Sequence, residues 1–250
     1  MNTHLLIGTG PRKVIALHGW FGHARGWGPL VDVLDTQDFS YAFMDCRGYG
    51  GMRGSGGPYT LDQIAQDALA LADGLGWQRF SLIGHSMCGS AIQRVLVDAP
   101  ARVEKLVAIA PVSPSGMALD NASWAFFSRT TKDAEARKRL LDMTTGLRLT
   151  SVWLDQMVAS SLAESDEAAY EAYLTAWAKT DFHAQIEGNP VQIKVIVGEH
   201  NPLLGAGAMA DTYMQWYPNA TLEVMGNAGH YPMNETPIAL ATSIEKFLRG

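Results

Sequence analysis

The residue with the strongest chemical signal in this chain is Ser86. An apolar run typical of a buried strand leads to Gly84, and a helical pattern of apolar residues at 92–96 follows the serine. Only a tight turn fits between them, and such a turn lifts Ser86 above the C-terminal edge of the strand. It also directs the first amide of the helix, that of Met87, at negative charge developing beside the serine. The sequence therefore predicts a nucleophile with half an oxyanion hole, with a helix-capping serine as the structural alternative.

His230 is the second candidate. It lies in a glycine-containing loop between the last strand-like run, at 221–225, and a closing helix at about 237–248. A lone histidine is more often structural than catalytic. A histidine that follows a strand at the same sheet edge as Ser86 could instead take the proton of the serine hydroxyl.

The elements that must position these residues alternate along the chain. Strand-like runs occur at 13–17, 40–45, 80–84, 103–109, 192–197 and 221–225, with helical patterns at 27–34, 60–75, 203–217 and 237–248. Alternation at this spacing predicts an α/β fold, a mostly parallel sheet flanked by helices. From 115 to 188 only helical patterns occur. We expect a core of residues 1–114 and 189–250, with 115–188 as an all-helical cap inserted between two strands.

Composition limits the classes of function. The chain has 250 residues, 47% of them hydrophobic, which is enough to bury one large core. A net charge of −6 and the lack of a basic block argue against nucleic-acid or anionic-membrane partners. The start of the sequence shows no secretory signal, no apolar segment is long enough to span a bilayer, and two cysteines suit a reducing compartment. We therefore expect a soluble cytoplasmic protein.

Metals and cofactors are not expected. His18, His85, His200 and His230 are not at a spacing typical of metal ligands. The glycine-rich run at 48–57 lacks the Gly-Lys-Ser/Thr ending of a phosphate-binding loop and the spacing of a dinucleotide fingerprint.

Several segments resemble the α/β-hydrolase family over nearly the whole chain. The surroundings of Ser86 resemble its nucleophile elbow, with Cys88 where the family has a glycine. Gly229-His230-Tyr231-Pro232 resembles its histidine loop, and His18-Gly19-Trp20 resembles its oxyanion loop. The resemblance implies that Trp20 N–H is the second oxyanion donor, opposite Met87 N–H.

By the same resemblance, the chain is a cofactor-free serine hydrolase. It would cleave a small, largely apolar ester, lactone or C–C bond through an acyl-enzyme on Ser86, with His230 as general base and acid. The segment Asp45-Cys46-Arg47-Gly48 also resembles the family, and we expect Asp45 and Arg47 to form an ion pair that fixes this loop.

The helical insert would form the roof of the site and select the substrate. We expect a mostly apolar pocket of modest size. The candidate lining residues are Phe21, Trp124, Trp153, Trp177 and Tyr231. Ordinary packing against the body of the protein is the alternative role for such aromatic side chains.

The position of the triad acid departs from the family pattern. The family has Gly-x-x-Asp after the strand at 192–197, and here Gly198-Glu199-His200-Asn201 carries an amide. An asparagine can orient His230 but cannot stabilise the imidazolium by charge, and its NH₂ group could select the wrong tautomer. Three explanations stay open: a deliberate Asp→Asn substitution, a natural triad supported by Glu199 or another acid, and a use of the pocket other than hydrolysis.

Two other functions therefore compete with hydrolysis. One is a small-molecule receptor or binding protein with feeble turnover, and the other is a non-hydrolytic, cofactor-independent enzyme of the same fold. The partner expected in each case is a small apolar molecule, and a homo-oligomer is compatible with the sequence.

Overall fold

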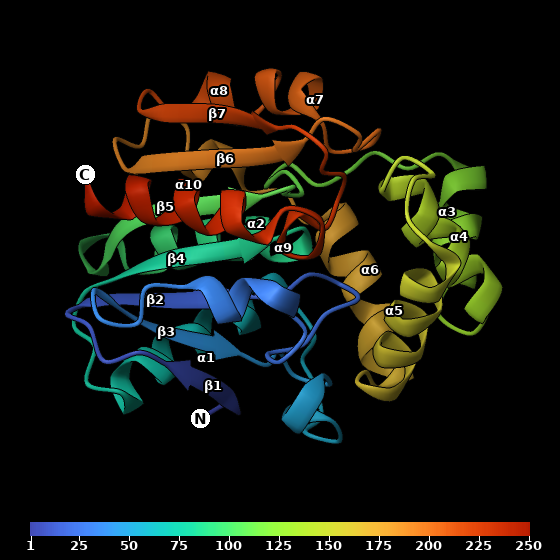
Figure 1. Cartoon of the computed structure of the whole chain (residues 1–250), viewed down its shortest axis with the longest axis horizontal. Helices are drawn as coiled ribbons and strands as arrows, with labels where there is room; N and C mark the ends of the chain where they lie inside the picture. Colours follow the sequence, from blue (N-terminus) through green and yellow to red (C-terminus); the bar gives the residue numbers. More distant parts are fainter.

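A single seven-stranded sheet forms the centre of the computed structural model, which describes all 250 residues (Figure 1). The strands are β1 (His4–Ile7), β2 (Arg12–Leu17), β3 (Phe39–Met44), β4 (Phe80–His85), β5 (Val103–Ile109), β6 (Gln192–Gly198) and β7 (Ala220–Met225). Their spatial order is β1-β3-β2-β4-β5-β6-β7, and only β1 runs antiparallel to its neighbour. The predicted mostly parallel sheet is confirmed, and the short edge strand β1 was not predicted.

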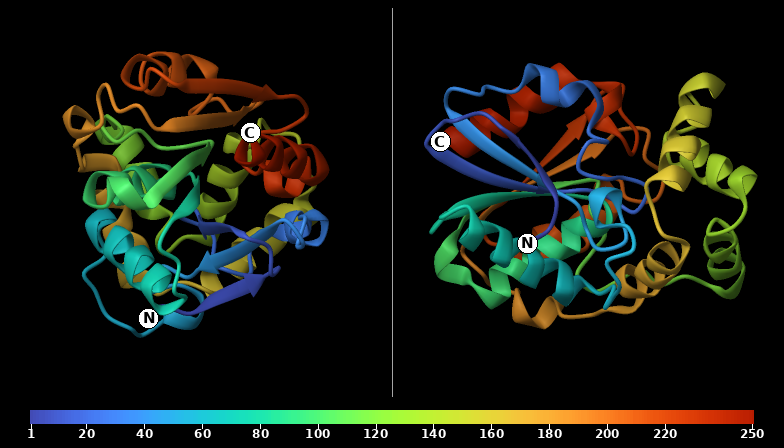
Figure 2. Two further views of the ribbon diagram at one scale, coloured as in Figure 1. Left: turned by 90° about the vertical axis from the view of Figure 1, so that its left-hand side faces the viewer. Right: turned by 90° about the horizontal axis from the view of Figure 1, so that it is seen from below.

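Helices cover both faces of the sheet (Figure 2). One face carries α1 (Leu61–Gly74) and α2 (Met87–Asp98), and the other carries α10 (Pro237–Arg249) and the 3₁₀ helix η1 (Gly28–Val33). The Thr60 hydroxyl accepts from Gln63 N–H at 3.1 Å and caps α1, as its sequence predicts. Other short elements outside the insert are η2 (Gly50–Met52), η3 (Pro100–Arg102) and α9 (Pro232–Glu235).

Two predicted helices are shorter than expected. The segment 27–34 forms only a 3₁₀ helix, because Gly28 has φ +57° and Pro29 follows it. The segment 203–217 forms α7 (Ala206–Ala210) and α8 (Tyr213–Trp216), interrupted at Thr212, whose φ and ψ are −130° and −91°. Glycine and threonine are poor helix formers, so the apolar spacing overestimated the length of this helix.

Between β5 and β6 the chain forms helices and no strand. These are α3 (Asn121–Arg129), α4 (Ala134–Thr144), α5 (Ser151–Ala163), α6 (Glu167–Lys179) and the 3₁₀ helix η4 (His183–Gln185). Asp120, Asp133 and Thr150 cap the first three by accepting from backbone N–H groups. The four α-helices lie beyond the C-terminal ends of the parallel strands, with α6 nearest the sheet (Figures 1 and 2).

Backbone hydrogen bonds connect the start of α6 to the loop after β3. Gly50 N–H donates to Glu164 O at 2.9 Å, and Asp166 N–H donates to Gly48 O at 2.7 Å. The Trp20 indole N–H also donates to Tyr170 O at 2.8 Å. This part of the helical segment is therefore fixed to the sheet rather than held only through its two ends.

The expected ion pair between Asp45 and Arg47 does not form. Arg47 instead makes two hydrogen bonds to Asp67 of α1, at 2.8 and 3.0 Å. Asp45 accepts from Ala24 N–H at 2.7 Å, from Gly51 N–H at 3.1 Å, and from the hydroxyl of Thr3. Both residues hold the loop in place, but each does so through a different partner.

Candidate active site

Ser86 occupies a strained turn between β4 and α2. Its φ is +53° and its ψ is −115°, a conformation that costs a non-glycine residue free energy. A Cβ on Gly84 would lie 2.2 Å from Cys88 O, and one on Gly89 would lie 2.2 Å from Pro111 Cβ. Helix α2 therefore lies in close contact with β4 at Gly84 and with the loop after β5 at Gly89. Cys88 is accommodated in the core, with its Sγ 3.8 Å from Cys46 Sγ.

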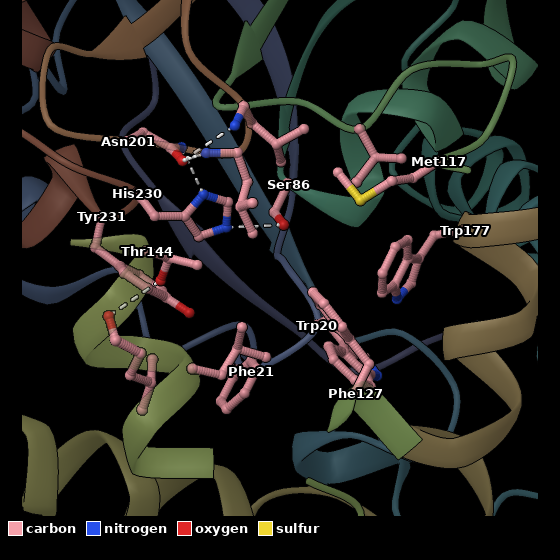
Figure 3. Close-up of a pocket in the computed structure, with 15 residues that line it drawn as sticks. Trp20, Phe21, Ser86, Met117, Phe127, Thr144, Trp177, Asn201, His230 and Tyr231 are labelled. Carbon is pink, nitrogen blue, oxygen red and sulfur yellow. Dashed lines mark hydrogen bonds between the residues drawn. The ribbon is translucent and has the colours of Figure 1, made fainter. Parts of the chain in front are cut away.

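His230 contacts Ser86 directly. Its Nε2 lies 3.0 Å from Ser86 Oγ, and both side chains are buried (Figure 3). Nε2 of the neighbouring His85 lies 2.8 Å from the backbone oxygen of His230. The backbone N–H of His230 donates to Thr144 O at 3.1 Å. Burial, and secondarily the nearby His85, hold the pKa of His230 well below its usual value. The imidazole is therefore neutral at pH 7 and able to carry one proton on either nitrogen.

Asn201 lies against the other nitrogen of this ring. Its Nδ2 is 3.0 Å from His230 Nδ1, and its Oδ1 accepts from the backbone N–H groups of Leu203 and Leu204 at 3.2 and 3.1 Å (Figure 3). Two donors on Oδ1 fix the orientation of the amide, since the reverse orientation would set N–H groups against N–H groups. The Asn201 NH₂ therefore donates to Nδ1 of His230.

This contact decides the tautomer of the neutral imidazole. With Nδ1 accepting, the ring proton resides on Nε2, and Nε2–H donates to Ser86 Oγ. A general base for Ser86 needs the opposite arrangement, in which Nε2 accepts the hydroxyl proton.

No carboxylate contacts the His230 ring. Glu199 is partly exposed, pairs with His200 at 2.7 Å and accepts from Asn227 N–H, so it does not support His230. Glu235 is buried close by, but it accepts from the backbone of the histidine loop and pairs with Arg148 at 2.9 Å. The alternative in which Glu199 replaces the triad acid is therefore not supported by its placement.

The two residues expected to supply the oxyanion donors adjoin Ser86, Met87 in the chain and Trp20 through the neighbouring Gly19. Met87 is the first residue of α2, so its N–H has no partner within the helix. The Trp20 backbone N–H donates to no protein atom. A Cβ on Gly19 would lie 3.0 Å from Ser86 Cβ, so the loop carrying Trp20 passes directly beside the nucleophile.

A mostly apolar pocket opens at Ser86 (Figure 3). It is lined by Trp20, Phe21, Ser86, Val112, Met117, Phe127, Leu140, Leu141, Thr144, Trp177, Asn201, Leu203, Leu204, His230 and Tyr231. Its free volume is about 50 Å³, a few times the roughly 10–15 Å³ that one water molecule needs on the same measure. The pocket is therefore of modest size.

Of the five residues expected on this pocket, Phe21, Trp177 and Tyr231 line it. Trp124 and Trp153 do not. The Trp124 ring lies beneath Lys179, whose Nζ is 4.2 Å from its centroid, and Trp153 packs edge-on against Tyr231 from outside the pocket, at 5.6 Å. The pocket also contains Met117, which precedes the first helix of the insert, and apolar residues of α3 and α4 that were not predicted. Helical spacing in a sequence shows which face of a helix is buried, but it does not show which surface that face contacts.

A comparison with protein families decides the family. The family model described as "Alpha/beta hydrolase family" matches residues 14–242. The chain belongs to the alpha/beta hydrolase family.

Relatives with known names share this family's hydrolase chemistry. The chain is 27% identical over 243 residues to a pimeloyl-[acyl-carrier protein] methyl ester esterase of Nitrosomonas europaea, covering 92% of each chain. It is 26% identical over 226 residues to a 2-hydroxymuconate semialdehyde hydrolase of Pseudomonas putida, covering 82% of this chain and 75% of that protein. A hydrolase from Oleispira antarctica shares the fold with a TM-score of 0.89 at 16% identity, covering 100% of this chain and 95% of its own. The alpha/beta hydrolase relatives of this chain are thus esterases and other hydrolases.

Three further observations concern membrane-spanning helices, metal clusters and two polar residues outside the site. No helix combines the length and apolar character that crossing a bilayer requires. No three His, Cys, Asp or Glu side chains gather as a metal site would need. Asp181 and His183, which the sequence does not place, pair with each other at 2.6 Å on the surface.

Proposed function

We propose that this chain is a cofactor-free serine hydrolase for a small, largely apolar ester, lactone or C–C bond, with intrinsically slow turnover. The contact between Ser86 Oγ and His230 Nε2 at 3.0 Å, in a buried apolar pocket, is the observation that carries the proposal. The strained turn at Ser86 supports a role as nucleophile, since a serine serving only as a helix cap needs no such φ. Its hydroxyl also accepts no hydrogen bond from the helix.

In the proposed reaction Ser86 Oγ attacks the carbonyl carbon of the substrate. Its proton passes to His230 Nε2, and the oxyanion is bound by the N–H groups of Trp20 and Met87. His230 then gives this proton to the leaving group, and an acyl-enzyme forms on Ser86. Water, activated by the same imidazole, releases the acid and restores the serine.

In this proposal Asn201 slows the reaction. Before attack, the His230 proton must move from Nε2 to Nδ1, and the Asn201 amide must turn away from its two backbone donors. Replacing the triad Asp by Asn in a serine protease lowers turnover about 10⁴-fold for the same reason. A comparable loss is expected here relative to a carboxylate at position 201.

Residues 115–188 act in this proposal as the cap that selects the substrate. Support comes from the pocket residues that this segment contributes, which include Phe127, Leu140 and Trp177. Cytoplasmic location and a homo-oligomer remain predictions of the sequence.

A second function is favoured by one observation. The fixed Asn201 amide suits a small-molecule binding protein in which hydrolysis is residual, because it holds the site in the inactive tautomer. The non-hydrolytic enzyme has no such observation in its favour.

Burst kinetics with p-nitrophenyl acetate and butyrate test the proposal. Wild type should release one equivalent of nitrophenol per site in a slow burst, and Ser86→Ala should release none above the rate of buffer. A binding protein would show saturable ligand binding with no burst in wild type. That result would reject the hydrolase.

A further inference from the structure

In the resting tautomer the Ser86 end of the pocket offers hydrogen-bond donors. His230 Nε2–H points at Ser86 Oγ, so the Ser86 hydroxyl accepts from the histidine and keeps its own proton free. Ser86 is 8% exposed and lines the pocket, and its oxygen has no other protein partner. The N–H groups assigned to the oxyanion hole, those of Trp20 and Met87, are also donors. The other hydroxyls on the pocket, those of Thr144 and Tyr231, can donate as well as accept.

No charged side chain lines the pocket, and the nearby carboxylate of Glu235 is paired with Arg148 at 2.9 Å. None of the lining residues is Asp, Glu, Lys or Arg, so no negative charge faces the cavity. Arg137 of α4 is 1% exposed and has no carboxylate partner; its hydrogen bonds go to Thr130 O, Thr131 O and the Ser161 hydroxyl. Its guanidinium lies 3.9 Å from the Tyr170 ring and 5.7 Å from the ring of Phe21, a pocket residue.

An uncompensated buried cation attracts an anion through a medium of low dielectric constant. In a hydrolase with Asp at the triad position, the charge of that Asp would oppose an anion at the nucleophile. Asn201 removes this opposition while its contact with His230 turns the imidazole into a donor. Both effects favour the same kind of ligand.

We propose that the resting site is a receptor for a small apolar carboxylate, whose oxygens accept from the Ser86 hydroxyl and the oxyanion amides, with the tail against the aromatic wall. The assignment rests on the proposed function, because it uses the same oxyanion donors. Such a carboxylate has the chemistry of the acid that ester cleavage would release. The site therefore retains its own class of product, and Asn201 is the residue that makes it do so.

Butyrate and butyramide are matched probes, equal in shape and different in charge. Their affinities can be measured from the fluorescence of Trp20 and Trp177, which both line the pocket. Wild type should bind butyrate at least about tenfold more tightly than butyramide. Asn201→Asp should weaken butyrate binding at least about tenfold and change butyramide binding less than about threefold. Asn121→Asp, the same change at an exposed position of α3, should leave both affinities unchanged.

Equal affinity for the two probes in wild type, or unchanged butyrate affinity in Asn201→Asp, would overturn the assignment. If Asn201→Asp does not fold by circular dichroism, Ser86→Ala takes its place. It should weaken butyrate about tenfold or more and butyramide less, since a hydrogen bond to a charged group is the stronger one. An equal loss for both probes would also refute the carboxylate.

The two proposals fail separately. A rise in esterase turnover in Asn201→Asp with unchanged butyrate affinity removes the carboxylate and keeps the hydrolase. Weakened butyrate binding in Asn201→Asp, together with no Ser86-dependent burst in wild type, removes the hydrolase and keeps the carboxylate.

Discussion

Asn201→Asp should convert this protein into a much faster esterase. In the variant one carboxylate oxygen can keep the hydrogen bonds from Leu203 and Leu204, now at 3.2 and 3.1 Å to Oδ1. The other oxygen would replace the Nδ2 that lies 3.0 Å from His230 Nδ1. It can only accept, so the imidazole proton must reside on Nδ1, and Nε2 becomes the acceptor for the Ser86 proton.

The expected size of the gain follows from two effects. Correcting the tautomer removes the proton shift that precedes attack, and the new charge stabilises the imidazolium that forms in the transition state. Together they are worth about 10⁴ in a serine protease, which corresponds to roughly 5 kcal/mol of barrier. Burial of the new carboxylate costs part of this gain, so we expect an increase in the acylation rate of about 10² to 10⁴.

The assay is the pre-steady-state burst of nitrophenol from p-nitrophenyl butyrate. Asn121→Asp is the control for an added charge, and its burst rate should match wild type. A folded Asn201→Asp protein whose burst rate rises less than about tenfold would refute the reasoning. It would mean that the Asn201 contact does not limit the reaction.

Three further outcomes are expected. Burial lowers the pKa of His85 to about 4; its neutral form therefore contributes stability that is complete above pH 6.5 and is lost as the pH falls toward 4. Between pH 7 and pH 4 the free energy of unfolding measured in urea should fall by about 3 kcal/mol more in wild type than in His85→Gln. Equal losses in the two proteins would exclude this role for His85. Because the pKa of His230 is also lowered, kcat/KM of wild type should stay flat from pH 8 to pH 6. In Asn201→Asp the new carboxylate raises the pKa of His230, so kcat/KM should fall within that range. A wild-type kcat/KM that halves near pH 6.5 would contradict the lowered pKa of His230. Gly84→Ala should lower the free energy of unfolding in urea by about 3 kcal/mol, because its Cβ would lie 2.2 Å from Cys88 O. Gly207→Ala in α7, with no atom within 4 Å of the added Cβ, should instead leave it unchanged or raise it by up to about 1 kcal/mol. Similar losses in the two variants would exclude the tight elbow.

The sheet could be predicted from sequence because its central strands are buried on both faces. All residues of β3 and β4 are buried, so they appear as continuous apolar runs. The edge strand β1 has four residues, three of them half-buried, and leaves no such pattern. A strand of this sheet could therefore be predicted where it is fully buried, and not where it lies partly exposed at the edge.

The site could be predicted only as far as the chain itself carries the information. The order of Ser86, position 201 and His230 along the sequence places them at one edge of a parallel sheet. The direction of the Asn201 amide could not be predicted, because it depends on two backbone N–H groups of the next turn. The partner of Arg47 was missed for a similar reason, since Asp67 is distant in sequence and comes near only when α1 packs on the sheet.

The attachment of α6 to the loop after β3 has a mechanical consequence. Hydrogen bonds at Glu164 and Asp166 and from the Trp20 indole to Tyr170 O join this helix to the sheet. The end of α4 is attached as well, because His230 N–H donates to Thr144 O and Arg148, just beyond the helix, pairs with Glu235. Any widening of the pocket would therefore displace α3 and the start of α4 between two anchored points, α6 and the histidine loop.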